Sequence, residues 1–212
     1  MDHSAFPSDM ELAALISSKI CHDVIGPVGA IYNCLEILDE DDEPTSRDYA
    51  LGVIRNVTEQ ASARLQFARF AFGAAGSAGA VIDLSMAEQI SRWFLDGKKH
   101  KLAWKVAPGQ ILKDKVKLLL NLVAMAVTAL PRGGDIEVTM TGSLEAPSFQ
   151  LRCKGTGARP PQHLTEFATG KNEPPLDPLT IQAYYTCRLA TQAGLRLEIV
   201  KDGDDVLLVA KA

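Results

Sequence analysis

The sequence predicts two structural parts: an N-terminal antiparallel helical hairpin and a C-terminal α/β sandwich. Three observations support this fold class. Apolar residues recur every three or four positions over the first 70 residues. Small residues fill positions 73–79, and beyond them strand-like runs alternate with helical stretches. We therefore expect a hairpin domain over residues 1–75 and a sandwich domain over residues 80–212.

The first predicted helix covers residues 9 to about 39, with Ser8 or Asp9 as the residue that caps its start. Its apolar stripe comprises Ile20, Val24, Val28, Ile31, Leu35 and Leu38. An acidic run over residues 39–43 and Pro44 end the pattern, because proline cannot continue a helix interior.

The second predicted helix starts with Thr45 or Ser46 as its cap and runs to about Phe72. Its stripe comprises Val53, Val57, Ala61, Leu65, Ala68 and Phe72. A lone hairpin cannot bury both stripes completely, so the pattern predicts a homodimer in which two hairpins form a four-helix bundle.

The C-terminal part reads as five strands and three helices. The strands are expected at 101–106, 135–141, 149–153, 195–200 and 206–210, and the helices at 85–96, 111–130 and 178–193. Turn residues at 202–204 and 142–147 predict two antiparallel hairpins within the sheet.

Bulk composition argues against several partners and sites. The formal net charge is −4 and no basic run could follow a phosphate backbone, so we expect no nucleic-acid partner. No stretch reaches eighteen uninterrupted apolar residues, and the N-terminus lacks the order of a signal peptide, which favours a cytoplasmic protein without a membrane anchor. The four cysteines show no zinc-ligand spacing.

The most informative residue is His22, which lies about 160° from Ile20 and Val24 on a helical wheel at roughly 100° per residue. It should therefore point to solvent. Its own helix face carries a set of mostly small residues that favour close docking of a partner. These docking candidates are Ser18, Lys19, Gly26, Gly29 and Asn33.

The chemistry of an imidazole suits group transfer at this position. An imidazole nitrogen is a nucleophile near neutral pH, because much of the side chain is unprotonated there. Asp23 is placed to accept a hydrogen bond from the other ring nitrogen and so orient the ring. Lys19, one turn earlier, is a candidate to neutralise phosphoryl charge.

The segment around His22 resembles the phosphotransfer domain of sensor histidine kinases, in which histidine, an acid and, three residues later, a proline form the acceptor motif. His22, Asp23 and Pro27 match it. The second domain resembles the ATP-binding domain of these kinases, the Bergerat fold, with three departures. Met125 replaces the asparagine that holds magnesium after Asn121, and Cys153 replaces the adenine-reading aspartate. The glycine-rich loop is replaced by the glycine-free residues 176–181.

This combination closely resembles the ChpT-type histidine phosphotransferases of alphaproteobacteria. The resemblance implies a homodimer that accepts a phosphoryl group on His22 from the receiver domain of a CckA-like hybrid histidine kinase. It also implies onward transfer to CtrA-like and CpdR-like response regulators of the cell cycle. No ATP, other cofactor or metal would be bound, and the receiver would bring the Mg²⁺.

Two alternatives remain open at the level of sequence. The protein could be an active histidine kinase with a divergent nucleotide site, or a dimeric scaffold that binds receiver domains and transfers nothing. A further expectation concerns Gly26, which stands where bifunctional kinases of this helix type carry a side chain that orients water. Glycine cannot do so, and we expect weak phosphatase activity.

Overall fold

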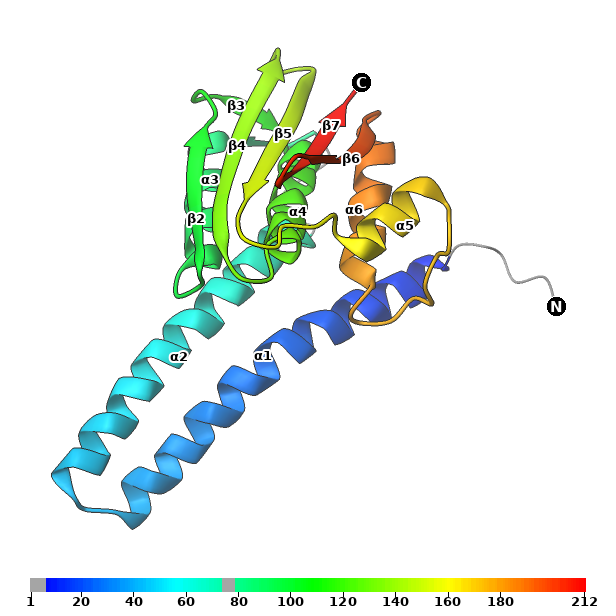
Figure 1. The fold of residues 1–212 in the computed structure, drawn as a ribbon. Helices are drawn as coiled ribbons and strands as arrows, with labels where there is room; N and C mark the ends of the chain where they lie inside the picture. The colour runs from blue at the N-terminus through cyan, green and yellow to red at the C-terminus, as the bar shows by residue number, and fades with distance from the viewer. Residues whose placement is uncertain (1–6, 74–78) are drawn as a thin grey trace.

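The computed structural model describes residues 7–73 and 79–212. The N-terminal part is an antiparallel hairpin of two long helices, α1 over Asp9–Glu40 and α2 over Pro44–Ala71, as predicted (Figure 1). The C-terminal part sits over the open end of the hairpin, opposite the turn that joins α1 to α2. The predicted domain boundary falls largely on residues 74–78, which lie outside the described residues.

The two hairpin helices begin in different ways. Ser8 caps α1 in a capping box: the Glu11 amide donates to Ser8 Oγ over 3.3 Å, and the Ser8 amide donates to Glu11 Oε2 over 2.8 Å. The prediction that Thr45 or Ser46 caps α2 is wrong, because Glu43 is the N-cap and Pro44 is the first helical residue. Proline suits that position since its backbone angle is already helical and no amide hydrogen needs a partner there.

A five-stranded sheet forms the outer layer of the C-terminal part, with the strand order β2-β4-β5-β7-β6. The strands are β2 His100–Lys105, β4 Gly134–Gly142, β5 Pro147–Lys154, β6 Arg196–Asp202 and β7 Asp205–Lys211. Both predicted β-hairpins are present, because β4 pairs antiparallel with β5 and β6 with β7. Only β2 runs parallel to its neighbour, β4.

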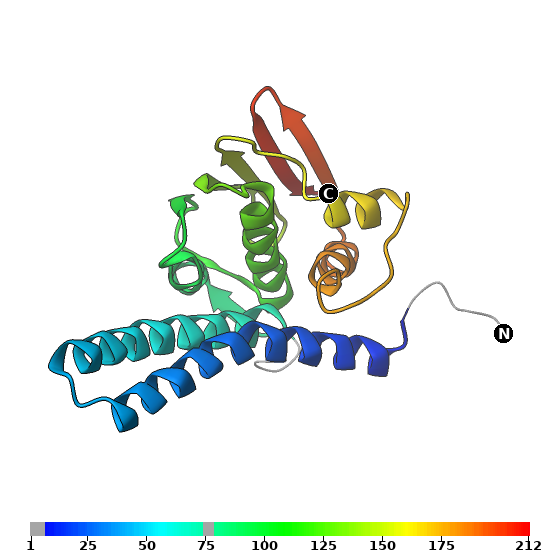
Figure 2. The same ribbon diagram turned by 60° about the horizontal axis from the view of Figure 1, so that its bottom comes forward.

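Helices cover one face of this sheet and separate it from the hairpin, so that three layers are stacked (Figure 2). These helices are α3 Leu84–Leu95, α4 Lys113–Ala129, α5 Gln162–Thr169 and α6 Ile181–Gln192. Helix α4 is buried almost all round and supplies the centre of the core. Helix α5 was not predicted from the sequence, because Pro160 and Pro161 in front of it are typical of a loop. In the structure, Pro161 is the N-cap of this helix.

A second, two-stranded sheet was also not predicted. Strand β1, Val81–Asp83, pairs antiparallel with β3, Gln110–Leu112. Three residues are too few to show the alternation by which a strand is recognised in sequence. This small sheet flanks α3 and α4 at the point where the chain enters the C-terminal part.

The hairpin and the C-terminal part share one hydrophobic core. Phe67 and Ala71, near the end of α2, belong to the same buried cluster as the residues of α4 and the sheet. The Phe67 ring stacks on Phe94 of α3 with 4.0 Å between the ring centroids. Helix α2 contacts α3 and α4, and α1 contacts α6. The last turns of α2 are therefore part of the C-terminal core.

Helix α1 is long and apolar enough, by length and composition alone, to cross a membrane. The same helix contacts α2 along the hairpin and carries the Lys19–Asp23 ion pair and Pro27 in its interior. Several of its apolar side chains nevertheless remain exposed in the single hairpin, among them Ile25, Val28 and Tyr32.

Candidate functional site

His22 lies on the middle of α1 with 64% of its side chain exposed. The orientation predicted from the helical wheel is therefore present in the structure. Ser18, Gly26, Gly29 and Asn33 are exposed on the same helix. A Cβ atom added at either glycine would meet no other atom within 4 Å. The surface around His22 is accordingly low and open, with room for the close approach of another protein.

Asp23 lies beside His22 but makes no hydrogen bond to its ring. Asp23 Oδ1 lies 3.6 Å from His22 Nδ1, which is longer than a hydrogen bond. The other carboxylate oxygen, Oδ2, accepts a short hydrogen bond of 2.5 Å from Lys19 Nζ. The predicted hydrogen bond between the imidazole and Asp23 is therefore not formed in this conformation, in which the carboxylate pairs with Lys19 instead.

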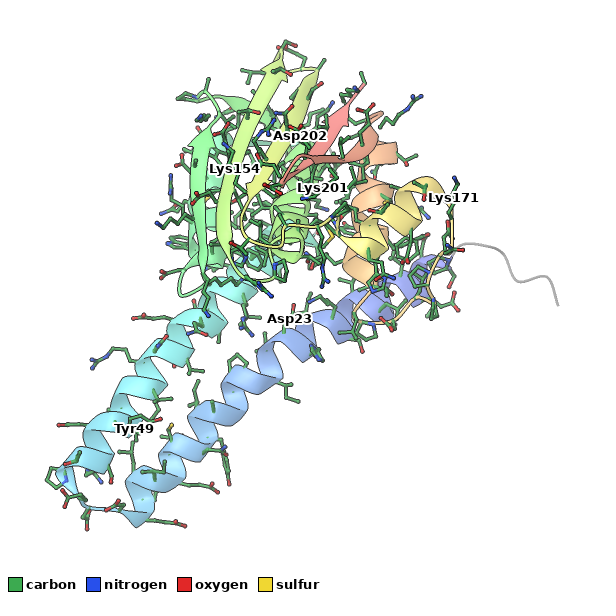
Figure 3. All side chains as sticks on the ribbon, in the orientation of Figure 1. Asp23, Tyr49, Lys154, Lys171, Lys201 and Asp202 are labelled. Carbon is green, nitrogen blue, oxygen red and sulfur yellow. The ribbon has the colours of Figure 1, made fainter. Side chains whose placement is uncertain are left out.

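Lys19 differs from the other docking candidates, because only 16% of its side chain is exposed. Its ammonium group lies on Asp23, at the edge of a cavity between the hairpin and the C-terminal part. Figure 3 labels Asp23 on the stretch of α1 that passes close to the C-terminal part, far from Tyr49 near the hairpin turn. His22 therefore sits beside the junction of the two parts.

Asn121, the residue shared with the kinase nucleotide motif, is fully buried in α4. Its side-chain amide donates to the carbonyl oxygen of Ala71 at 3.0 Å and to that of Lys117 at 2.9 Å. Its oxygen accepts from Gln182 Nε2 on α6 at 3.3 Å. Ala71 is the last residue of α2, so Asn121 caps the end of the hairpin. All three contacts are internal to the protein.

The two substituted kinase positions are also closed to solvent. Met125 is 6% exposed and Cys153 is fully buried in the core. Burial raises the pKa of the Cys153 thiol to about 12, so the side chain is neutral. Neither a thioether nor a buried neutral thiol can replace a hard oxygen ligand for Mg²⁺ or a carboxylate acceptor for adenine.

The turn before α6 replaces the missing glycine loop with a carboxylate. Asp177 Oδ1 accepts the backbone amide hydrogens of Leu179 and Thr180, at 2.8 and 2.9 Å. These two hydrogen bonds lower the pKa of Asp177, and the bond from Thr180 has the larger effect. Asp177 therefore carries a negative charge close to the start of α6, where a helix N-terminus would otherwise attract phosphate. The Asp177 carboxylate thus takes up the backbone amides that a bound phosphate would need.

A cavity of about 300 Å³ remains in this region of the C-terminal part. It lies between α4 and the start of α5, and Met125, Thr128, Pro161 and Ala183 are among its lining residues. Its wall also carries the polar or charged side chains of Arg159, Gln162 and His163. Among residues 7–73 and 79–212, no three His, Cys, Asp or Glu side chains are grouped so as to hold a metal ion.

Sequence reasoning missed two cationic residues of the site, Arg64 and Lys98. Arg64 on α2 donates from Nη1 to the backbone oxygen of Asp23 at 2.8 Å. Lys98, in the turn after α3, lines the same cavity as Lys19 and Asp23. Neither residue belongs to a local motif. The pairing of α1 with α2 brings Arg64 to Asp23, and the packing of the C-terminal part on the hairpin brings Lys98 to the same cavity.

Comparisons with known proteins agree with this architecture. The family described as "Histidine phosphotransferase C-terminal domain" matches residues 84–205. The protein phosphotransferase ChpT of Brucella abortus (strain 2308) is 41% identical over 205 residues, which cover 96% of this chain and 97% of that protein. A solved structure described as a bacterial phosphotransferase superposes with a TM-score of 0.90 and 38% identity, covering 98% of each chain. With this identity extending through the hairpin that carries His22 and through the altered nucleotide domain, the chain belongs to the family of ChpT-type histidine phosphotransferases.

Proposed function

We propose that this protein is the phosphotransferase of a multistep phosphorelay, with His22 as the residue that carries the phosphoryl group. The observation that supports this role most directly is an exposed histidine on an open helix face, within 3.6 Å of a carboxylate. The nucleotide positions of the C-terminal part are meanwhile buried or occupied by the chain itself. Both features support a protein that binds no ATP and receives the group from another protein.

The transfer step is a displacement at phosphorus. The Nε2 lone pair of His22 forms the new N–P bond while the P–O bond to a receiver aspartate breaks, and the aspartate leaves as a carboxylate. The ring keeps its proton on Nδ1, so the product imidazole is cationic. Asp23 Oδ1, 3.6 Å away, stabilises that charge, and a small rotation of either side chain would bring the pair into hydrogen-bond range. Onward transfer is the reverse step with a second receiver.

The proposed partners are receiver domains: that of a CckA-like hybrid histidine kinase as donor, and those of CtrA-like and CpdR-like response regulators as acceptors. The donor or acceptor receiver brings the Mg²⁺ that balances charge in the transition state, and this protein binds no cofactor of its own. Ser18, Gly26, Gly29 and Asn33 form the docking face, with Lys19 at its edge. Such partners place the protein in the cytoplasm, in a pathway of cell-cycle regulation.

The functional unit is proposed to be a homodimer in which two hairpins form a four-helix bundle. Large apolar side chains remain exposed on both helices of the single hairpin, as an unpartnered bundle face would require. They are Ile25, Val28, Tyr32 and Leu35 on α1, and Tyr49, Leu51 and Leu65 on α2. Light scattering after gel filtration should give twice the chain mass, and Tyr32→Glu should shift the protein toward monomer.

The decisive experiment transfers label from a phosphorylated hybrid-kinase receiver to the purified protein. Wild type should gain label, and His22→Ala should gain none while keeping its helical circular dichroism and its mass in solution. His163→Ala is the matched control, because His163 is also partly exposed but pairs with Glu166 at 3.0 Å on α5. It should accept label as wild type does. A wild-type protein that takes no label would remove the proposal.

The two alternatives give different results. An active kinase would label His22 from ATP alone, without any receiver. A scaffold would leave signalling intact in His22→Ala. The expectation of weak phosphatase activity is checked in the same assay: a receiver that loses phosphate to water faster with this protein than alone would contradict the role given to Gly26.

A further inference from the structure

A charged cavity of about 250 Å³ lies at the junction of the hairpin and the C-terminal part. The hairpin contributes Lys19 and Asp23 from α1 and Arg64 from α2 to its wall. The C-terminal part contributes Lys98 from the turn after α3 and Gln182 from α6. Groups from four segments distant in sequence therefore converge on one space, and three of them are cations.

The contacts within the cavity leave positive charge without a counterion. Lys19 is neutralised by Asp23, at 2.5 Å. Arg64 donates to the Asp23 backbone oxygen, which carries no formal charge. Lys98 Nζ lies over the Phe94 ring, 3.2 Å from its centroid. Within residues 7–73 and 79–212, no carboxylate oxygen lies within 4.0 Å of the charged nitrogens of Arg64 or Lys98.

The environment of Lys98 reflects this imbalance. Burial, followed by repulsion from Arg64, lowers the pKa of the Lys98 ammonium to about 8; Asp23 opposes the shift and Lys19 adds to it. A cation that is partly removed from water and held near two others gains when an anion enters the same space.

We propose that this cavity binds a free phosphate-class oxyanion between Arg64 and Lys98, with Lys19 and Gln182 as further polar groups at its wall. Its volume of about 250 Å³ is below the roughly 300–1,000 Å³ of pockets for drug-sized ligands, which suits a small ion. A doubly charged tetrahedral oxyanion matches two separated cations better than a halide does. The bound ion joins the hairpin to the C-terminal part, because its ligands come from both.

This site is distinct from the phosphoryl group carried on His22. His22 is 64% exposed and does not line the cavity, whereas its neighbours Lys19 and Asp23 do. Anion binding therefore goes beyond the proposed relay and does not depend on it. The two ideas separate in one variant, His22→Ala, which loses the acceptor and keeps the cavity.

The test uses the full-length protein at pH 7 and constant ionic strength, with inorganic phosphate titrated against chloride in a calorimeter. We expect saturable binding to wild type with a Kd on the order of 1 mM, as a few charge-assisted contacts imply. Lys98→Met keeps the apolar stem over Phe94 and removes the charge, and should bind at least about tenfold more weakly. Lys99→Met is the matched control, since Lys99 is exposed and absent from the cavity wall.

Lys98→Arg restores the charge and should restore binding, which separates lost charge from a damaged fold. His22→Ala should bind phosphate as wild type does. The proposal is overturned if wild type shows no saturable heat with phosphate, or if Lys98→Met and Lys99→Met bind phosphate equally well. It is also overturned if phosphate binding is lost in His22→Ala, because the anion would then sit at the acceptor.

Discussion

Replacing Asn121 with alanine tests whether this kinase-motif residue now serves the fold. The substitution removes three hydrogen bonds, two donated to the carbonyl oxygens of Ala71 and Lys117 and one accepted from Gln182. Ala71 is fully buried and ends α2, so its carbonyl loses a partner that no amide of the same helix replaces. Buried groups left unpaired cost about 1–3 kcal/mol each, and we expect a total loss of about 3 kcal/mol of unfolding free energy.

The measurement is urea unfolding followed by circular dichroism at a fixed protein concentration, because a dimer's stability depends on concentration. A loss of about 3 kcal/mol corresponds to a fall in Tm of roughly 6–12 °C for a domain of this size. Gln182→Ala is the control: it removes only the 3.3 Å contact, leaves the cap on Ala71 intact, and should cost about 1 kcal/mol. If Asn121→Ala unfolds within about 0.5 kcal/mol of wild type, the capping role is refuted.

Three further predictions concern the hairpin and the junction. The methyl group added in Gly29→Ala meets open space, so the substitution should stabilise α1 by about 0.5–1 kcal/mol and raise the Tm. The same methyl group should slow transfer from a receiver that docks on this face. A variant no more stable than wild type would contradict the predicted stabilisation. Cys21 is exposed beside His22, whereas burial raises the pKa of the Cys187 and Cys153 thiols to about 12. A thiol reagent at neutral pH should therefore modify Cys21 first, as seen by mass spectrometry, and the modified protein should no longer transfer phosphate. Equal labelling of Cys187 would count against this prediction. The pKa of Lys98 falls from 10.5 to about 8 on folding, so the unfolded chain holds a proton between these values that the folded chain lacks, and stability should rise with pH there. Relative to Lys98→Met, wild type should gain about 1 kcal/mol between pH 8 and 10 after allowance for solvent screening, and a flat difference would show that Lys98 is not desolvated.

The hairpin was predictable from sequence because its signals are local and long. The apolar period of 3.6 persists for about five turns in each helix, and Ser8 with Glu11 forms a cap that four residues specify. The unpredicted elements lack such signals. Helix α5 has only eight residues and follows two prolines, and the strands of the small sheet have three residues each. Their existence depends on packing against the rest of the domain.

Some features of the candidate site could likewise be predicted from the sequence, and others depend on tertiary packing. The exposure of His22 followed from its place on a helical wheel, and the loss of kinase residues followed from comparing motifs. The ion pair between Lys19 and Asp23 joins residues four positions apart on α1, a spacing that allows this contact but does not require it. Arg64 and Lys98 reach the same cavity from positions 41 and 75 residues after Asp23, through folding alone.

The burial of Cys153 limits which side chains its position in the sheet can accept. Its neighbours across the sheet are Ile136 on β4 and Val206 on β7, both fully buried. An aspartate in place of Cys153 would put a carboxylate among apolar side chains, at a cost on the order of several kcal/mol. A carboxylate acceptor at position 153 therefore conflicts with the packing of this sheet, because it would be an unpaired buried charge between two apolar strands.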